Sequence, residues 1–249
     1  MYAGLKQEPE HEAAKKDCMM DKVSVAFVPG LAADERLWRP VTEKLDQIVW
    51  PIMAQCKGES IAAWADEILA IAPEHFYVAG TSMGGYVALE VALRGDERLA
   101  GLILLNTNAR SASPQQRDRG VSLIDDVRNG HFDQVADKLA GLVGGGNPEA
   151  SKIAALMMRE AGPEIFVRQQ QAVLARKDRR AELPQITVPT LVIAGDNDLL
   201  VPPSVNNEMA RLIPNAELEI LPCGHMSTVE ASADVADKIR SWLEKQKIN

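Results

Sequence analysis

The feature that most constrains the fold is an alternation of short apolar runs with longer segments of helical periodicity, which begins at Val23. Segments of helical spacing lie at about 34–46, 60–72, 83–94, 203–213 and 228–246. This order predicts an α/β fold in which a mostly parallel sheet of about six strands carries helices on both faces. The six candidate strands span residues 23–28, 47–53, 76–80, 99–105, 189–195 and 216–221.

One interval, residues 107–186, breaks this alternation. It carries about four helical segments and no convincing strand, and Gly, Pro and Asn residues separate the segments. Because strand-like sequence resumes at Pro189, we interpret the interval as a helical cap inserted into one domain rather than as a second domain. The predicted organisation is an N-terminal tail (1–21), a core domain (22–106 and 187–249) and the cap (107–186).

Composition and charge argue against several classes of protein. The 27 basic and 35 acidic side chains leave a formal net charge of −8, which gives no general attraction for nucleic acid. No apolar run reaches the roughly 18 residues of a membrane-spanning helix. The charged N-terminus lacks a signal-peptide core, and the three cysteines are too few and too far apart for a disulfide framework. We therefore expect a cytoplasmic protein with no nucleic-acid or membrane partner, and the oligomeric state stays open.

The strongest local motif is Gly-Thr-Ser-Met-Gly at residues 80–84, directly after one predicted strand and before a predicted helix. A serine on such a turn is held in a strained backbone conformation, and the flanking glycines give the turn room. The hydroxyl of Ser82 would stand at the carboxyl edge of the sheet, beside a helix N-terminus that favours an oxyanion. The alternative is a serine that only caps an ordinary helix.

A base and an acid follow at the ends of two later strands. Asp196 and Asp198 come after the strand that ends at residue 195, and His225 comes after the strand that ends at residue 221. Because the carboxyl ends of parallel strands share one edge of a sheet, we expect Ser82, an aspartate and His225 to meet there. The residues alone leave the choice between the two aspartates open.

With these motifs, the sequence from about Val23 to Trp242 resembles the α/β-hydrolase superfamily in its serine-nucleophile branch. The order Ser, Asp, His is that of this family's triad. The resemblance implies that Ser82, Asp198 and His225 are catalytic, since the family's acid usually lies three residues after the glycine that ends its strand. Some relatives place the acid at the end of an earlier strand, and Asn106 stands there in this chain.

The resemblance also implies an oxyanion hole made of two backbone N–H groups. One belongs to Met83, the residue after the nucleophile, and the other to Leu31, in the loop after the first strand. Many relatives carry His-Gly in that loop, where this chain has Pro29-Gly30. The loop over residues 54–60 is shorter than in many relatives, and the two antiparallel strands that open the full family sheet are missing.

The activity that the resemblance implies is hydrolysis of a small-molecule carboxylic ester through an acyl-enzyme on Ser82, with no metal or organic cofactor. A lactonase similar to enol-lactone hydrolases is one alternative, and a non-catalytic ligand-binding protein on the same fold is another. Several apolar residues of the cap either line an acyl pocket or only pack the cap helices against the sheet. They are Leu142, Val143, Ile153, Leu156, Met157, Met158, Ile165, Phe166 and Val167.

The remaining reactive residue types have structural interpretations. Cys56 and Cys223 are expected to pack as small hydrophobes. The other histidines, at positions 11, 75 and 131, show no metal-ligand spacing, and the basic segment 176–180 is typical of a solvated helix end.

Overall fold

A computed structural model describes residues 22–247, so the tail predicted over residues 1–21 lies outside the described part. These described residues form one sheet of six parallel strands in the order β2-β1-β3-β4-β5-β6. All six predicted strands are present, and the predicted fold class is confirmed. The strands are β1 (Val23–Val28), β2 (Val49–Met53), β3 (Phe76–Thr81), β4 (Leu99–Leu105), β5 (Thr190–Gly195) and β6 (Ala216–Leu221).

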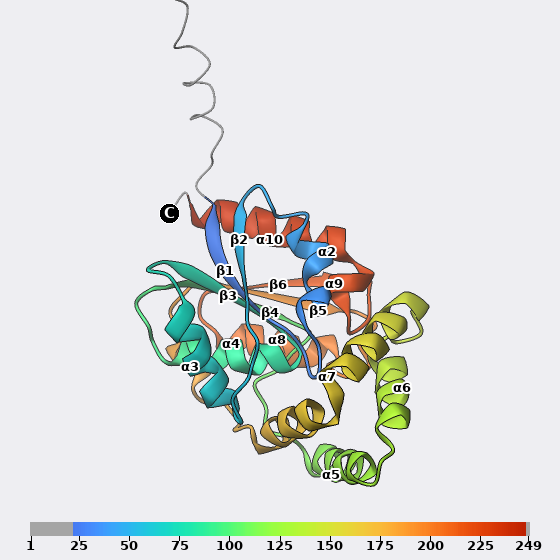
Figure 1. The fold of residues 1–249 in the computed structure, drawn as a ribbon. Helices are drawn as coiled ribbons and strands as arrows, with labels where there is room; N and C mark the ends of the chain where they lie inside the picture. Colours follow the sequence, from blue (N-terminus) through green and yellow to red (C-terminus); the bar gives the residue numbers. More distant parts are fainter. Residues whose placement is uncertain (1–21, 248–249) are drawn as a thin grey trace, which may run out of the picture.

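Helices cover both faces of this sheet (Figure 1). On one face lie α2 (Arg39–Thr42) and α10 (Ser232–Gln246), and on the other lie α3 (Ile61–Ile71), α4 (Met83–Leu93) and α8 (Pro203–Leu212). Successive side chains of a strand point to opposite faces, so a strand covered on both sides must be apolar throughout.

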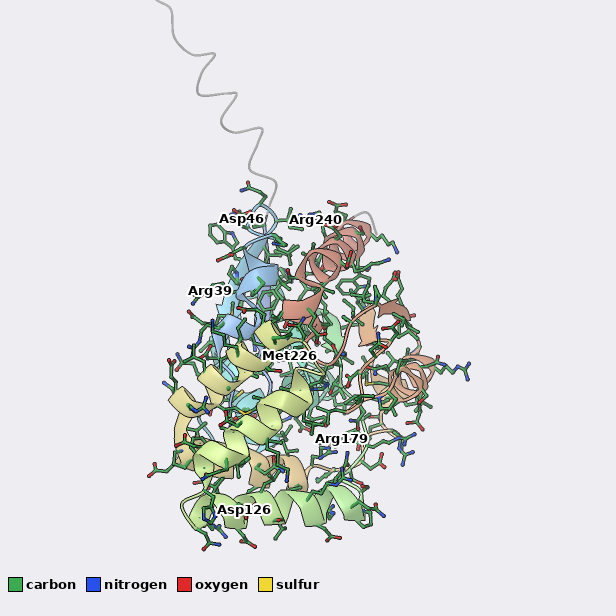
Figure 2. The ribbon with its side chains drawn as sticks, turned by 90° about the vertical axis from the view of Figure 1, so that its right-hand side faces the viewer. Arg39, Asp46, Asp126, Arg179, Met226 and Arg240 are labelled. Atoms are coloured by element: carbon green, nitrogen blue, oxygen red, sulfur yellow. The ribbon has the colours of Figure 1, made fainter. Side chains whose placement is uncertain are left out.

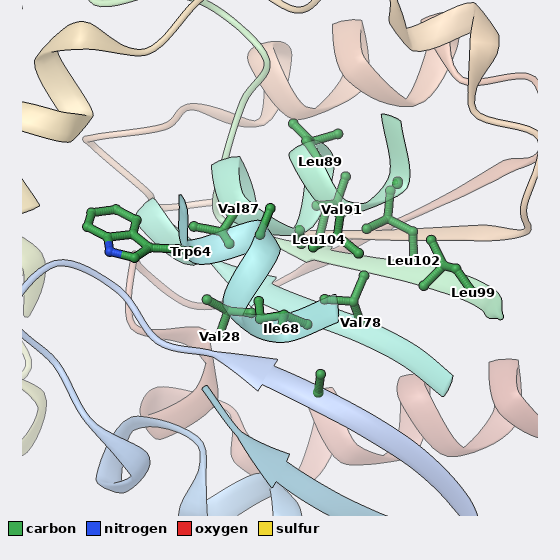
Figure 3. Packing of buried hydrophobic residues seen from close by; sticks show 14 of the residues in the cluster. Val28, Trp64, Ile68, Val78, Val87, Leu89, Val91, Leu99, Leu102 and Leu104 are labelled. Carbon is green, nitrogen blue, oxygen red and sulfur yellow. The ribbon is translucent and has the colours of Figure 1, made fainter. Parts of the chain in front are cut away.

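Strand β1 illustrates this two-sided burial. Val25 and Phe27 pack into the cluster beneath α2 and α10, whereas Ala26 and Val28 pack into the cluster beneath α3 and α4. Figure 3 shows the second cluster, in which Trp64 and Ile68 of α3 pack with residues of α4 and of the strands below. The continuous apolar runs of the sequence therefore reflect a core on each side of the sheet.

Two predicted helices differ from those observed. The segment predicted at 34–46 forms a short 3-10 turn, η1 (Glu35–Leu37), followed by α2, which has Pro40 in its first turn. Proline lacks a backbone N–H and suits a helix start, so it begins a new helix there instead of continuing an old one. The segment predicted at 228–246 is divided at Ala231 into α9 (Ser227–Glu230) and α10.

The interval between β4 and β5 is helical, with α5 (Pro114–Arg128), α6 (Phe132–Val143) and α7 (Pro148–Ala175) gathered at one end of the molecule (Figure 1). Helix α7 is interrupted at Gly162, whose φ is 84°, and a short 3-10 turn, η2 (Leu183–Gln185), follows it. The interval therefore holds four α-helical segments and one 3-10 turn, where the sequence predicts about four helical segments. Figure 2 looks onto this end and labels Met226, which shares an apolar cluster with Ala140 of α6 and Ala154 of α7. Among the described residues, no helix is long and apolar enough to span a membrane.

Candidate active site

Ser82 stands on the sharp turn that joins β3 to α4. Its φ of 52° and ψ of −116° form a conformation that residues with a side chain rarely adopt, and the surrounding structure must compensate for the strain. The Ser82 N–H donates to Leu105 O at 3.0 Å, and the Ser82 carbonyl accepts from Thr107 Oγ1 at 2.8 Å. Hydrogen bonds from the end of β4 therefore hold the turn.

The glycines on either side of Ser82 allow backbone segments to approach closely. A Cβ on Gly84 would lie 2.2 Å from Val28 O, and a Cβ on Gly80 would lie 2.2 Å from Gly84 O. Neither contact is sterically possible, so these positions require glycine. The motif at residues 80–84 thus brings the start of α4 against the end of β1.

His225 and Asp198 lie next to Ser82, in the loops that follow β6 and β5. His225 Nε2 is 2.9 Å from Ser82 Oγ, and His225 Nδ1 is 2.8 Å from Asp198 Oδ2. An ionised carboxylate only accepts hydrogen bonds, so Nδ1 carries the proton and donates it to Asp198. In the neutral ring, Nε2 is then free to accept the hydroxyl proton of Ser82.

The Asp198 carboxylate is fully buried and accepts four hydrogen bonds. Oδ1 accepts from the N–H groups of Leu200 and Val201 at 2.8 and 2.9 Å, and Oδ2 accepts from Asn106 Nδ2 at 3.0 Å as well as from His225. Burial acts to raise the pKa of Asp198, but the hydrogen bonds and charge of His225, together with the other donors, outweigh it and leave this pKa below its ordinary value. Asp198 is therefore ionised at neutral pH.

Asp196 is not brought to the histidine. It is exposed, and its carboxylate accepts a hydrogen bond of 2.6 Å from the neighbouring Asn197. Of the two aspartates, Asp198, which the family resemblance favours, is the one beside His225.

Two further residues hold the acid and the histidine loop, and sequence reasoning missed their roles. Asn106 donates to Gly224 O at 3.2 Å as well as to Asp198, and its side-chain oxygen accepts from Ser227 Oγ at 2.6 Å. The carboxylate of Glu230 accepts from the N–H groups of Gly224 and Met226, both at 2.9 Å. The available signals for Asn106 are that it directly follows a strand and that it occupies the alternative acid position of the resembled family. Nothing local marks Glu230.

The two expected oxyanion donors lie beside this turn. Met83 is the first residue of α4, so its N–H has no partner within the helix. Leu31 lies in a turn closed by a hydrogen bond of 3.3 Å from Ala33 N to Gly30 O. A Cβ on Gly30 would be only 3.6 Å from Ser82 Cβ, so the Leu31 turn borders the nucleophile.

A cavity of about 180 Å³ opens onto Ser82 and His225. Among the described residues that line it, none is Asp, Glu, Lys or Arg, and most are apolar. Leu142, Val143, Met157 and Met158 of the cap line it, in agreement with one of the two interpretations of the sequence. Ile153 and Phe166 of that set are not among the lining residues, and they pack into the apolar clusters that also contain Met157 and Met158.

The two cysteines within the described residues, Cys56 and Cys223, are buried thiols. Burial raises the pKa of both Cys56 and Cys223 to about 12, which keeps them protonated and unreactive at neutral pH. Within residues 22–247, no group of three or more His, Cys, Asp or Glu side chains could hold a metal ion. His11 lies outside the described residues.

The basic segment 176–180 is only partly the solvated helix end that the sequence suggests. Arg176 is buried, donates from Nε to Arg110 O at 2.9 Å, and lies over the Tyr86 ring at 4.6 Å. Arg179 pairs with Glu90 of α4 (Figure 2 labels Arg179). The guanidinium groups of Arg176 and Arg179 are therefore held by tertiary contacts and are not fully solvated.

Comparison with known proteins identifies the fold family of this chain. A family model described as alpha/beta hydrolase fold matches residues 58–232, which is more than half of the chain. A pimeloyl-(acyl-carrier protein) methyl ester esterase of Nitrosomonas europaea is 27% identical over 221 residues, covering 81% of this chain and 88% of the relative.

Several solved structures share the fold of this chain. A thermophilic esterase from Thermogutta terrifontis superposes with a TM-score of 0.81 at 28% identity, over 90% of each chain. The enol-lactonase from Burkholderia xenovorans LB400 superposes with a TM-score of 0.78 at 23% identity, over 90% of this chain and 92% of that one, which shows the shared fold alone. The predictions of the fold and of a hydrolase are confirmed at the level of the family. The chain belongs to the alpha/beta hydrolase fold family.

Proposed function

We propose that the protein hydrolyses a small carboxylic ester through an acyl-enzyme on Ser82. The observation that carries this proposal is the unbroken hydrogen-bond chain from Ser82 Oγ through His225 to Asp198, with distances of 2.9 and 2.8 Å. Such a chain couples a nucleophile, a general base and an orienting acid. The similarity to two proteins described as esterases, at 27% and 28% identity, supports the same reaction class.

In the acylation step, Ser82 Oγ attacks the carbonyl carbon of the ester while His225 Nε2 takes the hydroxyl proton. Asp198 holds the Nδ1–H tautomer and stabilises the imidazolium that forms. The bond from the carbonyl carbon to the alcohol oxygen then breaks. The alcohol oxygen takes the proton from Nε2 and leaves, and the acyl group remains on Ser82.

In the deacylation step, a water gives a proton to His225 and attacks the acyl carbon, and Ser82 Oγ leaves with that proton. The carbonyl oxygen becomes an oxyanion in both steps. The N–H groups of Leu31 and Met83 would stabilise it, and each such donor contributes about 3 kcal/mol in related systems. These steps require no metal or organic cofactor.

The cavity beside Ser82 favours a small, uncharged and apolar substrate group. Its volume is about 180 Å³, and apolar side chains dominate its wall. A carboxylate or ammonium placed there would lose its hydration without gaining a partner of opposite charge. We propose that residues 107–186 act as a cap that supplies part of this wall, while residues 22–106 and 187–249 form the core that supplies the three reacting side chains.

A fluorophosphonate probe tests the proposal directly. We expect it to label Ser82 in the wild-type protein and to leave Ser82→Ala unlabelled. Ser82→Ala should also lose activity on p-nitrophenyl esters. A folded wild-type protein that takes no label would instead indicate the non-catalytic, ligand-binding alternative. A series of p-nitrophenyl esters of increasing acyl length, measured beside several lactones, separates the esterase from the lactonase alternative.

A further inference from the structure

The loop that carries the Leu31 N–H is tied to the cap by one buried hydrogen bond. We call residues 29–32 the oxyanion loop. The Ala32 N–H donates to Gln169 Oε1 of α7 at 2.7 Å, although the two residues are 137 positions apart in the sequence. Both residues are buried, with exposed fractions of 1% and 4%. The reaction described above uses Leu31 but leaves Gln169 without a role.

Ala32 needs this support, because its backbone is in an unfavourable conformation. Its φ of 48° is in the left-handed region, which costs an alanine on the order of 1 kcal/mol. The amide is also buried, and a buried N–H without an acceptor is strongly disfavoured. Gln169 supplies that acceptor, so the hydrogen bond stabilises the strained turn.

The side chain of Ala32 is held by the cap as well. It belongs to an apolar cluster whose other buried members, within the described part of the chain, are cap residues, among them Met158 and Phe166 of α7 and Val135 of α6. On the other side, Gly30 borders Ser82. Leu31 therefore lies between a residue at the nucleophile and a residue fixed to the cap.

We propose that Gln169 is a positioning residue, through which the cap keeps the oxyanion loop in the conformation that presents Leu31 N–H to the reacting carbonyl oxygen. This inference rests on the proposed function. Without the acceptor, Ala32 can relax from its strained φ and rotate the adjoining peptides. The oxyanion would then be less well stabilised in both acyl-transfer steps, and substrate binding in the cavity would change little.

Two substitutions of Gln169 separate this role from mere packing. Gln169→Met keeps the length of the side chain but has no strong acceptor, whereas Gln169→Glu keeps an acceptor oxygen in either protonation state. The matched control is Gln171→Met, an exposed position on the same helix. The readouts are kcat and KM for a small p-nitrophenyl ester, and the inhibition constant of a trifluoromethyl ketone, whose adduct with Ser82 carries the oxyanion.

For Gln169→Met we expect kcat to fall about tenfold or more and the ketone to bind more weakly by a similar factor, with KM within about threefold. Gln169→Glu should retain most of the activity, and Gln171→Met should match the wild type. If Gln169→Met does not fold, Gln169→Asn is measured in its place with the same expectation. Its side chain is one methylene shorter, so its amide oxygen does not reach the Ala32 N–H.

A folded acceptor-free variant with unchanged kcat and ketone affinity would overturn the inference, as would one that raises KM alone. Failure of the proposed function is recognised separately, because the wild type would then take no fluorophosphonate label, or Ser82→Ala would keep the activity of the wild type. If Ser82→Ala is inactive while Gln169→Met is normal, only the positioning role is wrong.

Discussion

The side-chain amide of Asn106 donates a hydrogen bond of 3.0 Å to Oδ2 of Asp198, the same oxygen that accepts from His225 Nδ1. Asn106 is at the end of β4, where some α/β-hydrolase relatives carry their acid. In this chain the position supports the carboxylate at the end of the next strand of the sheet. The hydrogen bond stabilises the ionised form of Asp198 and fixes its orientation towards the histidine.

Replacing Asn106 by aspartate should convert this support into repulsion. Two carboxylates at such a distance cannot both be ionised, and the donor to Asp198 is lost. We expect Asn106→Asp to lower the free energy of unfolding by about 1–3 kcal/mol at pH 7, and by less at pH 5, where the pair binds a proton more easily. Urea denaturation measures both values, with the exposed Asn197→Asp as control. An equal loss at both pH values would contradict the prediction.

The two aspartates after β5 should differ sharply in their effect on catalysis. Asp198→Asn keeps the shape of the side chain but favours the wrong tautomer of His225, so kcat should fall by about four orders of magnitude. Asp196→Asn, at an exposed position, should stay within about twofold of the wild type. Steady-state kinetics on one p-nitrophenyl ester suffices. A larger loss at Asp196 would reassign the acid.

The same carboxylate should make stability depend on pH. The pKa of Asp198 is lower in the folded protein than its ordinary value, so its contribution to stability is fully present above the unfolded-state pKa of about 3.9. That contribution disappears as the pH falls through the folded-state pKa. The difference in unfolding free energy between wild type and Asp198→Asn should therefore narrow as the pH falls below about 4, as measured by urea denaturation. A constant difference would argue against the lowered pKa.

Gly84 should not tolerate a side chain. Because a Cβ there would lie 2.2 Å from Val28 O, Gly84→Ala must displace backbone, and we expect a loss of about 3 kcal/mol in stability together with loss of activity. Gly141→Ala is the matched control, since Gly141 is exposed within α6 and an added Cβ would meet no neighbouring atom within 4 Å. That variant should gain about 1 kcal/mol. Equal effects at the two glycines would refute the steric argument.

A cation at the cavity wall should change the charge preference. Leu142 lines the cavity and is 45% exposed, so Leu142→Lys can keep its ammonium hydrated near a bound substrate. The measured quantity is the ratio of kcat/KM for a monomethyl ester of a dicarboxylic acid to kcat/KM for a neutral methyl ester. We expect this ratio to rise about fivefold in Leu142→Lys, and to rise less in high salt. Leu156→Lys, at 47% exposure and away from the cavity, should leave the ratio unchanged.

The pattern of residues along the chain predicts the six strands, the helical interval and the meeting of Ser82 with His225. These follow from local rules, because strands covered on both faces must be apolar and parallel strands share one carboxyl edge. Glycines at residues 80 and 84 indicated the sharp turn, since no other residue fits its close contacts. By contrast, the single helix expected over 34–46 is not observed. Pro40 begins a separate helix there, so the apolar spacing of this segment does not correspond to one continuous helix.

The side chains that support the site are set by tertiary packing. Asn106 donates to Asp198 from 92 positions away in the sequence. Gln169 reaches the oxyanion loop across 137 positions of the chain. No local pattern encodes such contacts, because they depend on how separate helices and loops pack against one another, and a buried donor bonds to whichever acceptor that packing brings within reach.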